Sequence, residues 1–294
     1  MNISVEHLSM QFKNGTKALH DVNLNIGHGV YGLLGENGAG KTTFMRILTT
    51  LLKPTDGHVK MNGISLKEEN YRTIRKKIGY LPQELGLYPH LSVRETLEYI
   101  GGLNGIKQKH CKERVTYYLE KTSLIQHQKK KNKQLSGGMR RRVGLIQALL
   151  HEPEILIVDE PTTGLDPEER IRIRNLLVDF SKERTVLLST HVVEDLSATC
   201  SHLGIMKTGS LIFHGSMSPL LDMAKGKIWM TQVKGEDEYE KLGENYVVTS
   251  RQYRDNGILV KFISENTPEI KCVSNEITLE DAYVYQMHKA EERA

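Results

Sequence analysis

The chain has 294 residues, of which 38% are hydrophobic and 26% are charged, a composition typical of soluble globular proteins. This length allows one large domain, or one domain with a small appendage. The formal net charge of +4 is too small to indicate nucleic-acid binding by itself, and no apolar run approaches the roughly 18 residues of a membrane span.

The cysteines and the N-terminus indicate the compartment. Cys111, Cys200 and Cys272 are odd in number, scattered, and without the spacing of metal ligands. The chain does not begin with a basic segment followed by an apolar stretch, as a signal peptide would. We therefore expect a cytoplasmic protein, or one held at the cytoplasmic face of the cell membrane, without a transmembrane segment of its own.

The first part of the chain alternates strand-like and helix-like runs. Residues 1–34 alternate in polarity, with turns at 14–15 and 27–29, and predict antiparallel strands. More apolar strand-like runs follow at 30–35, 78–82, 154–160 and 185–190. The run at 154–160 is almost entirely apolar before its carboxylates, which is typical of a strand buried on both faces of a parallel sheet. The pattern predicts an α/β fold.

A mainly helical insert is expected within this first domain. Residues 84–134 carry little strand signal. Ser92 and Glu95 have the spacing of a capping box, which predicts a helix over 93–103. A second helix is expected over 108–124. We place the insert at about 84–150, in a domain spanning 1–224.

After residue 225 the character of the sequence changes. Strand-like runs occur at 227–233, 246–253 and 257–264, and a helix-like run at 278–290. These runs predict a small α+β appendage over 225–294. The appendage contains no motif that indicates its role.

A phosphate-binding loop is the strongest motif. The stretch "GENGAGKT" at 35–42 follows an apolar run and precedes a helix-like run, as a P-loop requires. Its glycines allow backbone N–H groups and a helix N-terminus to face phosphates, the lysine can reach the β- and γ-phosphates, and the threonine hydroxyl can ligate Mg²⁺. The alternative is a chance glycine-rich turn. The expected nucleotide-binding residues here are Gly35, Glu36, Asn37, Gly38, Ala39, Gly40, Lys41, Thr42 and Thr43.

Polar side chains follow three of the predicted strands. Asp159 and Glu160 end the run "ILIVDE" and are suited to hold Mg²⁺ and to polarise a water molecule. The alternative for this pair is a solvated acidic turn. His191 follows 185–190 and could contact a γ-phosphate, and Gln83 follows 78–82 and could ligate Mg²⁺. Taken alone, each of these two residues could equally be structural or simply exposed.

Taken together, residues 1–220 resemble the nucleotide-binding subunit of an ATP-binding cassette (ABC) transporter. The motifs follow the order of that family: the loop at 35–42, Gln83, "LSGGM" at 135–139, "ILIVDE" at 155–160, "GLD" at 164–166, and His191. The resemblance implies a P-loop NTPase with a parallel-sheet core, an antiparallel β subdomain and a helical insert. It also implies ATP and Mg²⁺ as cofactors, with Glu160 and His191 in catalysis and Thr42, Gln83 and Asp159 at the metal.

The resemblance further implies a head-to-tail dimer, either with a second copy or with a homologous subunit. ATP would lie between the phosphate loop of one chain and the signature segment of the other: Leu135, Ser136, Gly137, Gly138 and Met139. Asp166 would lie in an interface loop. Two positions depart from the usual pattern. Met139 replaces a glutamine, and Phe12 stands where a tyrosine usually stacks on adenine, unless Phe12 is a core aromatic.

Three functions remain to be distinguished. The favoured one is the ATPase subunit of a transporter, acting on a separate transmembrane permease. The segments "ELGLYPHLSVRETLEYI" and "TLEDAYVY" resemble subunits of exporters. The alternatives are a soluble ABC-type ATPase in translation or DNA repair, and a non-catalytic phosphate-binding module. The first alternative usually carries two cassettes or a long coiled coil, and the second conflicts with the presence of Lys41, Asp159, Glu160 and His191. No nucleic-acid partner is expected.

Overall fold

The computed structural model describes residues 2–274 and 276–292. By its contacts the chain divides into two compact units, Met1–His214 and Gly215–Ala294. The boundary expected after residue 224 falls at the end of α8 (Met217–Ala224), inside the second unit. Among the described residues, no helix is both long and apolar enough to cross a lipid bilayer.

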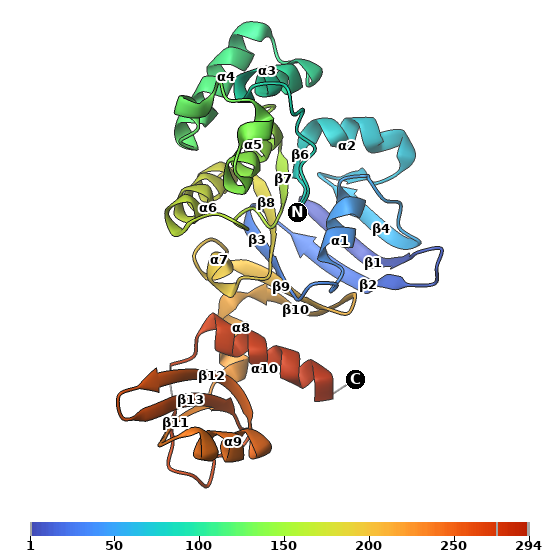
Figure 1. Ribbon diagram of the computed structural model, residues 1–294. Helices are drawn as coiled ribbons and strands as arrows, with labels where there is room; N and C mark the ends of the chain where they lie inside the picture. Colours follow the sequence, from blue (N-terminus) through green and yellow to red (C-terminus); the bar gives the residue numbers. More distant parts are fainter. Residues whose placement is uncertain (1, 275, 293–294) are drawn as a thin grey trace. The chain divides into compact units, whose positions relative to one another are not determined.

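A six-stranded sheet forms the centre of the first unit (Figure 1). Its order is β10-β9-β3-β8-β7-β6, and the pairs β9/β3, β3/β8, β8/β7 and β7/β6 are parallel. The strands are β3 (Gly29–Leu34), β6 (Ile78–Leu81), β7 (Ile155–Asp159), β8 (Thr185–Thr190), β9 (His202–Lys207) and β10 (Ser210–Ser216). All residues of β7 and β8 are buried, as expected for strands covered on both faces.

The expected strands at 30–35, 78–82, 154–160 and 185–190 correspond to β3, β6, β7 and β8. One assignment was wrong. The antiparallel front was expected to continue to residue 34, but β3 pairs in parallel with β8 and β9. The turn at 27–29 therefore carries the chain from one sheet into another. Strands β9 and β10 were not predicted.

The second sheet of this unit has the order β2-β1-β4-β5 and is antiparallel. Its strands are β1 (Ile3–Gln11), β2 (Lys17–Ile26), β4 (Asp56–Met61) and β5 (Ile64–Ser65). Alternate residues of β1 and β2 point into a shared core with α1 (Lys41–Leu48), where Phe44 and Met45 are completely buried. This packing holds α1, and the loop that precedes it, against both sheets.

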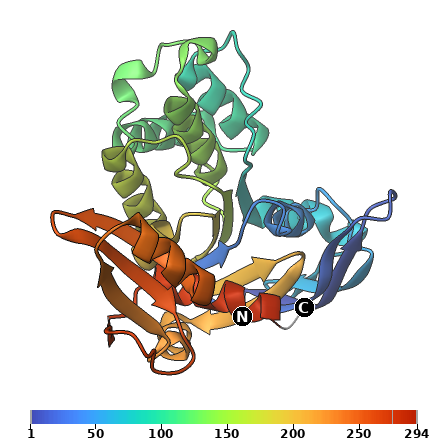
Figure 2. The same ribbon diagram turned by 60° about the horizontal axis from the view of Figure 1, so that its bottom comes forward.

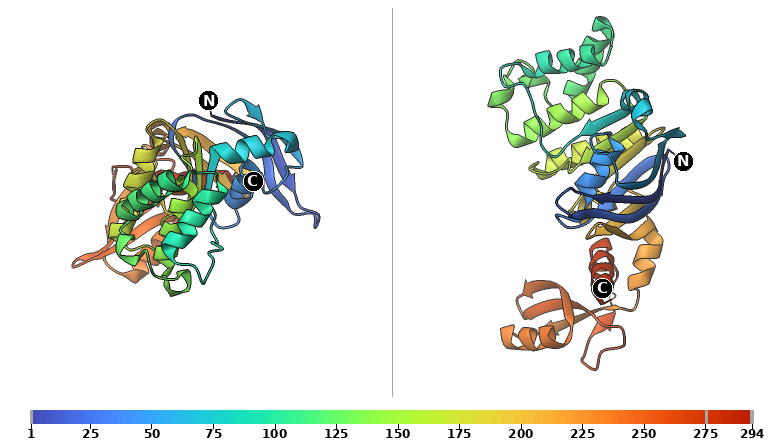
Figure 3. Two further views of the ribbon diagram at one scale, coloured as in Figure 1. Left: turned by 90° about the horizontal axis from the view of Figure 1, so that it is seen from above. Right: turned by 90° about the vertical axis from the view of Figure 1, so that its right-hand side faces the viewer.

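The helical insert forms a separate lobe at one end of the unit (Figures 1 and 3). It contains α3 (Val93–Leu103), α4 (Gln108–Lys121) and α5 (Gly137–Leu149). The capping box is present: Ser92 Oγ accepts a hydrogen bond from Glu95 N, and Glu95 Oε2 accepts one from Ser92 N. The remaining helices of the unit are α2 (Tyr71–Lys77), α6 (Pro167–Ser181) and α7 (Val193–Ser197).

The second unit contains a four-stranded antiparallel sheet of order β12-β13-β11-β14 (Figures 1 and 2). Its elements after α8 are β11 (Ile228–Val233), α9 (Glu236–Asn245), β12 (Val247–Arg254), β13 (Gly257–Ile263), β14 (Val273–Ser274) and α10 (Leu279–Glu292). α9 covers a small core that includes Val260 and Phe262, and α8 packs against α10. The three longer strands and α10 match expectation, whereas α9 and β14 were not predicted.

A close contact between β6 and α5 leads to a test of the packing. A Cβ atom on Gly79 would lie 2.2 Å from the carbonyl oxygen of Ala148, whereas one on Gly102, in α3, would meet nothing within 4 Å. We predict that Gly79→Ala lowers the free energy of unfolding by about 1–3 kcal/mol, because rigid backbone must move. The matched variant Gly102→Ala should raise it by roughly 0.5–1 kcal/mol. Urea titration of both variants distinguishes them, and equal effects would contradict the packing.

Candidate functional site

The parallel register brings the expected site residues to one edge of the central sheet. Leu34 pairs with Thr190, Asp159 with Ser189, and Leu81 with Val158. The segments that leave the carboxyl ends of β3, β7, β8 and β6 therefore start side by side. Ligands of open parallel sheets bind at this edge.

The phosphate loop between β3 and α1 depends on its glycines. Gly38 and Gly40 have φ angles of +84° and +101°, a region that other residues rarely adopt. A Cβ atom on Gly35 would lie 2.5 Å from Met206 O, and one on Gly40 would lie 2.6 Å from Ala18 O. Larger residues at these positions would force the loop open. Glu36, Asn37 and Gly38 are exposed at the tip of the loop, where backbone groups can meet a ligand.

Lys41, the first residue of α1, is buried beneath this loop. Its Nζ donates hydrogen bonds to the carbonyl oxygens of Gly35 (2.5 Å) and Glu36 (2.9 Å). Burial lowers the pKa of Lys41, and the nearby carboxylates of Glu160 and Asp159 oppose that shift. No side chain caps the start of α1, whose N-cap is Gly40. A buried ammonium and an uncapped helix start together form a cradle for an anion.

Asp159, at the end of β7, is 1% exposed and links α1 to β8. Its Oδ2 accepts a hydrogen bond from Thr42 Oγ1 at 3.0 Å, and its Oδ1 accepts one from Ser189 Oγ. Mg²⁺ prefers such hard oxygen ligands, so the donor set fits this ion. The described residues contain no group of three or more His, Cys, Asp or Glu side chains that could hold a metal. Mg²⁺ is commonly held by one or two carboxylates together with phosphate and water oxygens, and the single buried carboxylate of Asp159 fits such a site.

Glu160 is held in a constrained conformation. Its φ of +52° lies in the left-handed region, which is uncommon for a residue with a side chain. Glu160 N donates to Ser189 O at 3.1 Å, and Thr163 Oγ1 donates to Glu160 Oε2 at 3.2 Å. His191 Nδ1 lies 2.9 Å from Glu160 Oε1 and forms an ion pair when the imidazole is protonated. The two expected catalytic residues thus contact each other directly.

Gln83 lies close to this pair but is not joined to the metal ligands. It lines a hollow of about 380 Å³ together with Glu160, Thr163 and Gly137. Its side chain is exposed, and within residues 2–274 and 276–292 it has no hydrogen bond to Asp159 or Thr42. The structure therefore places Gln83 beside Glu160, and its expected role as a metal ligand stays a prediction.

The three arginines after the signature segment have different surroundings. Arg140 is exposed, whereas Arg141 and Arg142 are buried. Arg141 Nη1 donates to the carbonyl oxygens of Pro82 (2.5 Å) and Gln83 (2.9 Å), while its Nε and Nη2 have no hydrogen-bond partner in the part of the chain that the structure describes. Arg142 pairs with Glu169 at 2.5 Å. Arg141 therefore ties α5 to the segment that begins at Gln83.

The signature segment begins α5. Ser136 Oγ accepts a hydrogen bond from Met139 N at 3.2 Å, and Ser136 and Gly137 are exposed. Leu135 is buried, and a Cβ atom on Gly138 would lie 2.9 Å from Leu165. Asp166 caps α6 by accepting a hydrogen bond from Glu169 N at 2.9 Å. This arrangement presents the start of α5 at the surface.

Phe12 follows β1 and is 37% exposed, so it is not a core aromatic. Phe12 N donates to Thr16 O across the turn between β1 and β2. Among the described residues, Phe12 has no aromatic contact and no hydrogen bond with Glu160 or His191. A stacking role remains a prediction.

A buried charged network supports the site, and sequence reasoning did not find it. Asp195, in α7, accepts hydrogen bonds from Thr162 Oγ1 and from the guanidinium of Arg174 in α6. Asp195 is 1% exposed. The network joins the segment after Glu160 to the segment after His191. Ser189 was also missed, although a serine that follows the apolar run Val186–Leu188 and lies two residues before His191 is a usable signal.

The arrangement is suited to phosphoryl transfer to water. Lys41 and the helix start would hold phosphate oxygens, and Asp159 and Thr42 would hold Mg²⁺ against them. Glu160 accepts hydrogen bonds at a fixed position and can orient a water molecule, with His191 beside it. In such reactions the protein mainly positions groups and stabilises charge.

Comparisons with known proteins agree with this chemistry. The protein family described as "ABC transporter" matches residues 19–163. The phosphonates import ATP-binding protein PhnC of Wolinella succinogenes is 33% identical, covering 87% of this chain and 97% of PhnC. The bacitracin transport ATP-binding protein BcrA of Bacillus licheniformis is 33% identical, covering 91% of this chain and 92% of BcrA. The dimeric, post-hydrolysis structure of the ATP-binding cassette MJ0796, bound to ADP and Pi, is 27% identical and covers 73% of this chain and 98% of its own, with a TM-score of 0.68.

Fold, motifs and relatives lead to one assignment. The sheet edge presents the phosphate loop, the acidic pair and the histidine together, and two relatives match along nearly their whole length. The ABC ATPase cassette that the sequence predicted is confirmed. The chain belongs to the ABC transporter family, as an ATP-binding subunit that hydrolyses ATP.

Proposed function

We propose that this subunit drives export through a separate transmembrane permease, with Mg²⁺-ATP held between two cassettes arranged head to tail. The contact of Glu160 with His191 carries the catalytic part of the proposal, because it places a candidate water-orienting carboxylate beside a residue that can contact a γ-phosphate. Asp159 and Thr42 support the metal, since their oxygens lie within hydrogen-bond distance of each other.

The dimer is supported by the exposed start of α5. Ser136 and Gly137 lie at the exposed N-terminus of α5. A phosphate bound in the same chain would already face the N-terminus of α1, so the N-terminus of α5 is available to a nucleotide on a partner chain. In a two-fold dimer, two different patches of one chain meet the same two patches of its partner. The head-to-tail arrangement therefore creates two equivalent sites. The structural neighbour MJ0796 is itself dimeric.

The docking surface for the permease is proposed on the helical insert. Tyr88 is 49% exposed and packs edge-on against Tyr99, with ring centroids 5.6 Å apart, and Leu103 is exposed one turn further along α3. Such an apolar surface patch is typical of an interaction site. In the same segment Leu85 and Leu87 are half-buried, and Leu85 Cδ2 would lie 2.5 Å from a Cβ atom added to Gly144 of α5.

The patch is connected to the ATP site by the chain itself. Gln83, whose carbonyl oxygen is held by Arg141, begins the segment that leads to Tyr88. Tyr88 O and Pro89 O accept hydrogen bonds from Asn132 and Lys133, just before the signature segment. A change at Gln83 can therefore reach the patch. The direction of export rests on the resemblance of 84–100 and 278–285 to exporter subunits; among the relatives, PhnC is named for import and BcrA for bacitracin transport.

Glu160→Gln tests the catalytic role. The amide keeps the shape of the side chain but removes its charge, so ATP should still bind while hydrolysis falls roughly 100- to 10,000-fold. Steady-state phosphate release and nucleotide affinity are measured on the same preparation. A turnover rate within a factor of two of the native protein would exclude Glu160 as the residue that orients water.

A mixing experiment tests the composite sites. Lys41→Ala and Ser136→Arg each damage both sites of their own homodimer. If the sites are shared between chains, a mixed dimer has one site with both lesions and one with neither. Random pairing then leaves roughly one site in four intact, and ATPase activity should partly return. If mixing restores nothing while dimers form, each site lies within a single chain.

Tyr88→Asp tests the docking patch. Because Tyr88 is exposed, the variant should fold and hydrolyse ATP, but it should lose most of its association with washed membranes of the producing cell. Tyr117→Asp is the matched control, since Tyr117 is a similarly exposed tyrosine on α4 of the same insert. Equal membrane association of both variants would place the docking surface elsewhere.

A further inference from the structure

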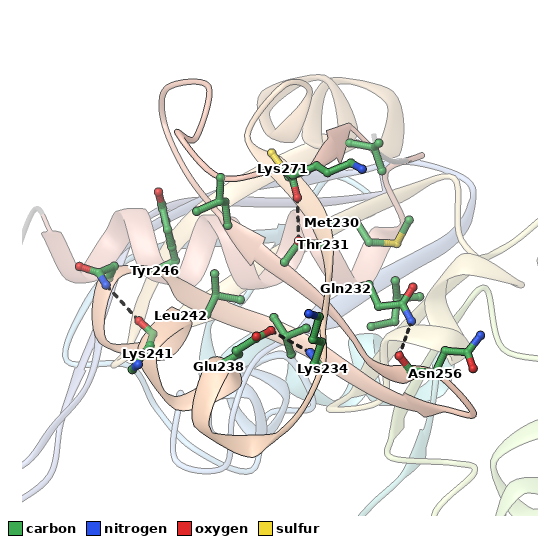
Figure 4. A pocket seen from close by; sticks show the side chains of 16 residues that line it. Met230, Thr231, Gln232, Lys234, Glu238, Lys241, Leu242, Tyr246, Asn256 and Lys271 are labelled. Carbon is green, nitrogen blue, oxygen red and sulfur yellow. Dashed lines mark hydrogen bonds between the residues drawn. The ribbon is translucent and has the colours of Figure 1, made fainter.

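The second unit contains a cavity of about 860 Å³ that lies entirely within that unit and far along the chain from the ATP site. It opens between α9, the edge of β11 and the segment 270–273 (Figure 4). Its size is in the range of pockets that bind small molecules, about 300–1,000 Å³. Nothing in the ATPase mechanism uses it.

Hydrogen bonds hold the walls of this cavity in place. Thr231 Oγ1 donates to Lys271 O at 2.8 Å and fastens the segment 270–273 over β11, as Figure 4 shows. Gln232 Nε2 donates to Asn256 O at 2.9 Å at another edge of the cavity. A ligand would therefore meet a largely pre-formed site and would lose little affinity to ordering of the walls.

Most of the wall is apolar. The contributing side chains include Val233, Leu242, Tyr246, Leu259, Ile270 and Val273. Val233 and Leu242 belong to the buried core, but Val273 is 57% exposed and Ile270 is also exposed. Exposed apolar side chains at the mouth of a cavity are covered when an apolar ligand enters, and this favours binding.

The charges around the cavity have one dominant sign. Lys234, Lys241 and Lys271 line it, against the single carboxylate of Glu238. Glu238 Oε2 is already engaged, because it accepts a hydrogen bond from Lys234 N at 2.8 Å at the start of α9. The three ammonium groups and this one carboxylate leave a net positive charge around the cavity.

Within the part of this unit that the structure describes, the lysines that line the cavity differ from the other lysines in having no carboxylate partner. The four other lysines of residues 215–292 all have carboxylate partners: Lys225 with Asp222, Lys227 with Glu265, Lys261 with Asp281, and Lys289 with Glu265. Among the described residues, the ammonium groups of Lys234, Lys241 and Lys271 have neither an ion pair nor a hydrogen bond. The three unpaired lysines of the unit are the three that line its cavity.

We propose that this cavity binds an amphipathic anion: a molecule with an apolar chain or ring system and a carboxylate or phosphate group. The apolar part would cover Leu259, Ile270 and Val273, and the anionic group would lie against one of the lysine ammonium groups, which stand at separate places around the cavity (Figure 4). Opposite charge near a protein surface favours binding, and the apolar wall excludes small hydrophilic anions as good ligands. This inference is independent of the proposed export function.

Titration of the full chain with dodecanoate tests the proposal. Trp229 is the one tryptophan of the sequence, and it packs beside the core that the cavity borders, so its fluorescence reports binding. Dodecanoate and dodecyl phosphate should bind saturably with one site per chain. Dodecyltrimethylammonium, with the same chain and the opposite charge, should bind at least tenfold more weakly, as should acetate, which lacks the apolar chain.

Variants locate the site. An exposed ion pair contributes about 1.4- to 5-fold in affinity, so replacing all three cavity lysines by glutamine should weaken dodecanoate binding roughly two- to tenfold. Val273→Asp should also weaken it. Lys225→Gln, a lysine of the same unit outside the cavity, should leave affinity unchanged. The fluorescence of Trp229 without ligand, which reports on the second unit, confirms that each variant is folded.

The same anionic chemistry occurs on membrane lipids, so sedimentation with phosphatidylglycerol and phosphatidylcholine vesicles forms a further arm. Dodecanoate binding without lysine-dependent sedimentation supports the proposed cavity ligand. Lysine-dependent sedimentation without dodecanoate binding overturns it and indicates a lipid-surface contact. Equal affinity for dodecanoate and dodecyltrimethylammonium, unchanged affinity in the triple variant, or no binding at millimolar dodecanoate also overturns it.

Discussion

The buried carboxylate of Asp159 is the interaction on which the ATP site depends. A charge with 1% exposure must be hydrogen-bonded or neutralised, and this one accepts from Thr42 of α1 and Ser189 of β8. The bonds join the first helix after the phosphate loop to the neighbouring strand. Because Asp159 and Ser189 are partners in the parallel register, the geometry follows from strand pairing. The strand pairing thus positions the oxygens that would receive a cation.

The strain at Glu160 is sustained by the same pairing. A left-handed conformation costs of order 1–3 kcal/mol and persists only where the surroundings determine it. Here Glu160 N is held by Ser189, and the segment that follows is held by Thr162 on Asp195. Arg174 completes that buried network from α6. These hydrogen bonds therefore hold the strained Glu160 with its carboxylate at the edge of the sheet, beside His191.

The sequence predicted the features that depend on neighbouring residues better than those that depend on tertiary contacts. Strands β3, β6, β7 and β8 were predictable because strands buried on both faces appear as apolar runs. The helix at α6 was missed although Asp166 and Pro167 are a good N-cap and first residue. α9 was hidden because Leu242 is its one buried residue. The burial of Arg141 could not be predicted, since its partners, the carbonyls of Pro82 and Gln83, are brought to it only by tertiary folding.

Arg141 links the signature segment of a chain to the segment that begins at Gln83 of the same chain. It lies on the helix whose start carries Ser136, and its guanidinium holds the backbone at Gln83, so a displacement of α5 would reach the segment leading to Tyr88. The two buried nitrogens without partners leave unsatisfied donors at this junction. Unsatisfied buried donors are costly, and a neighbouring acceptor that moves into range would be stabilised. Arg141 is therefore less completely hydrogen-bonded than Asp195, whose two carboxylate oxygens both have donors within the chain.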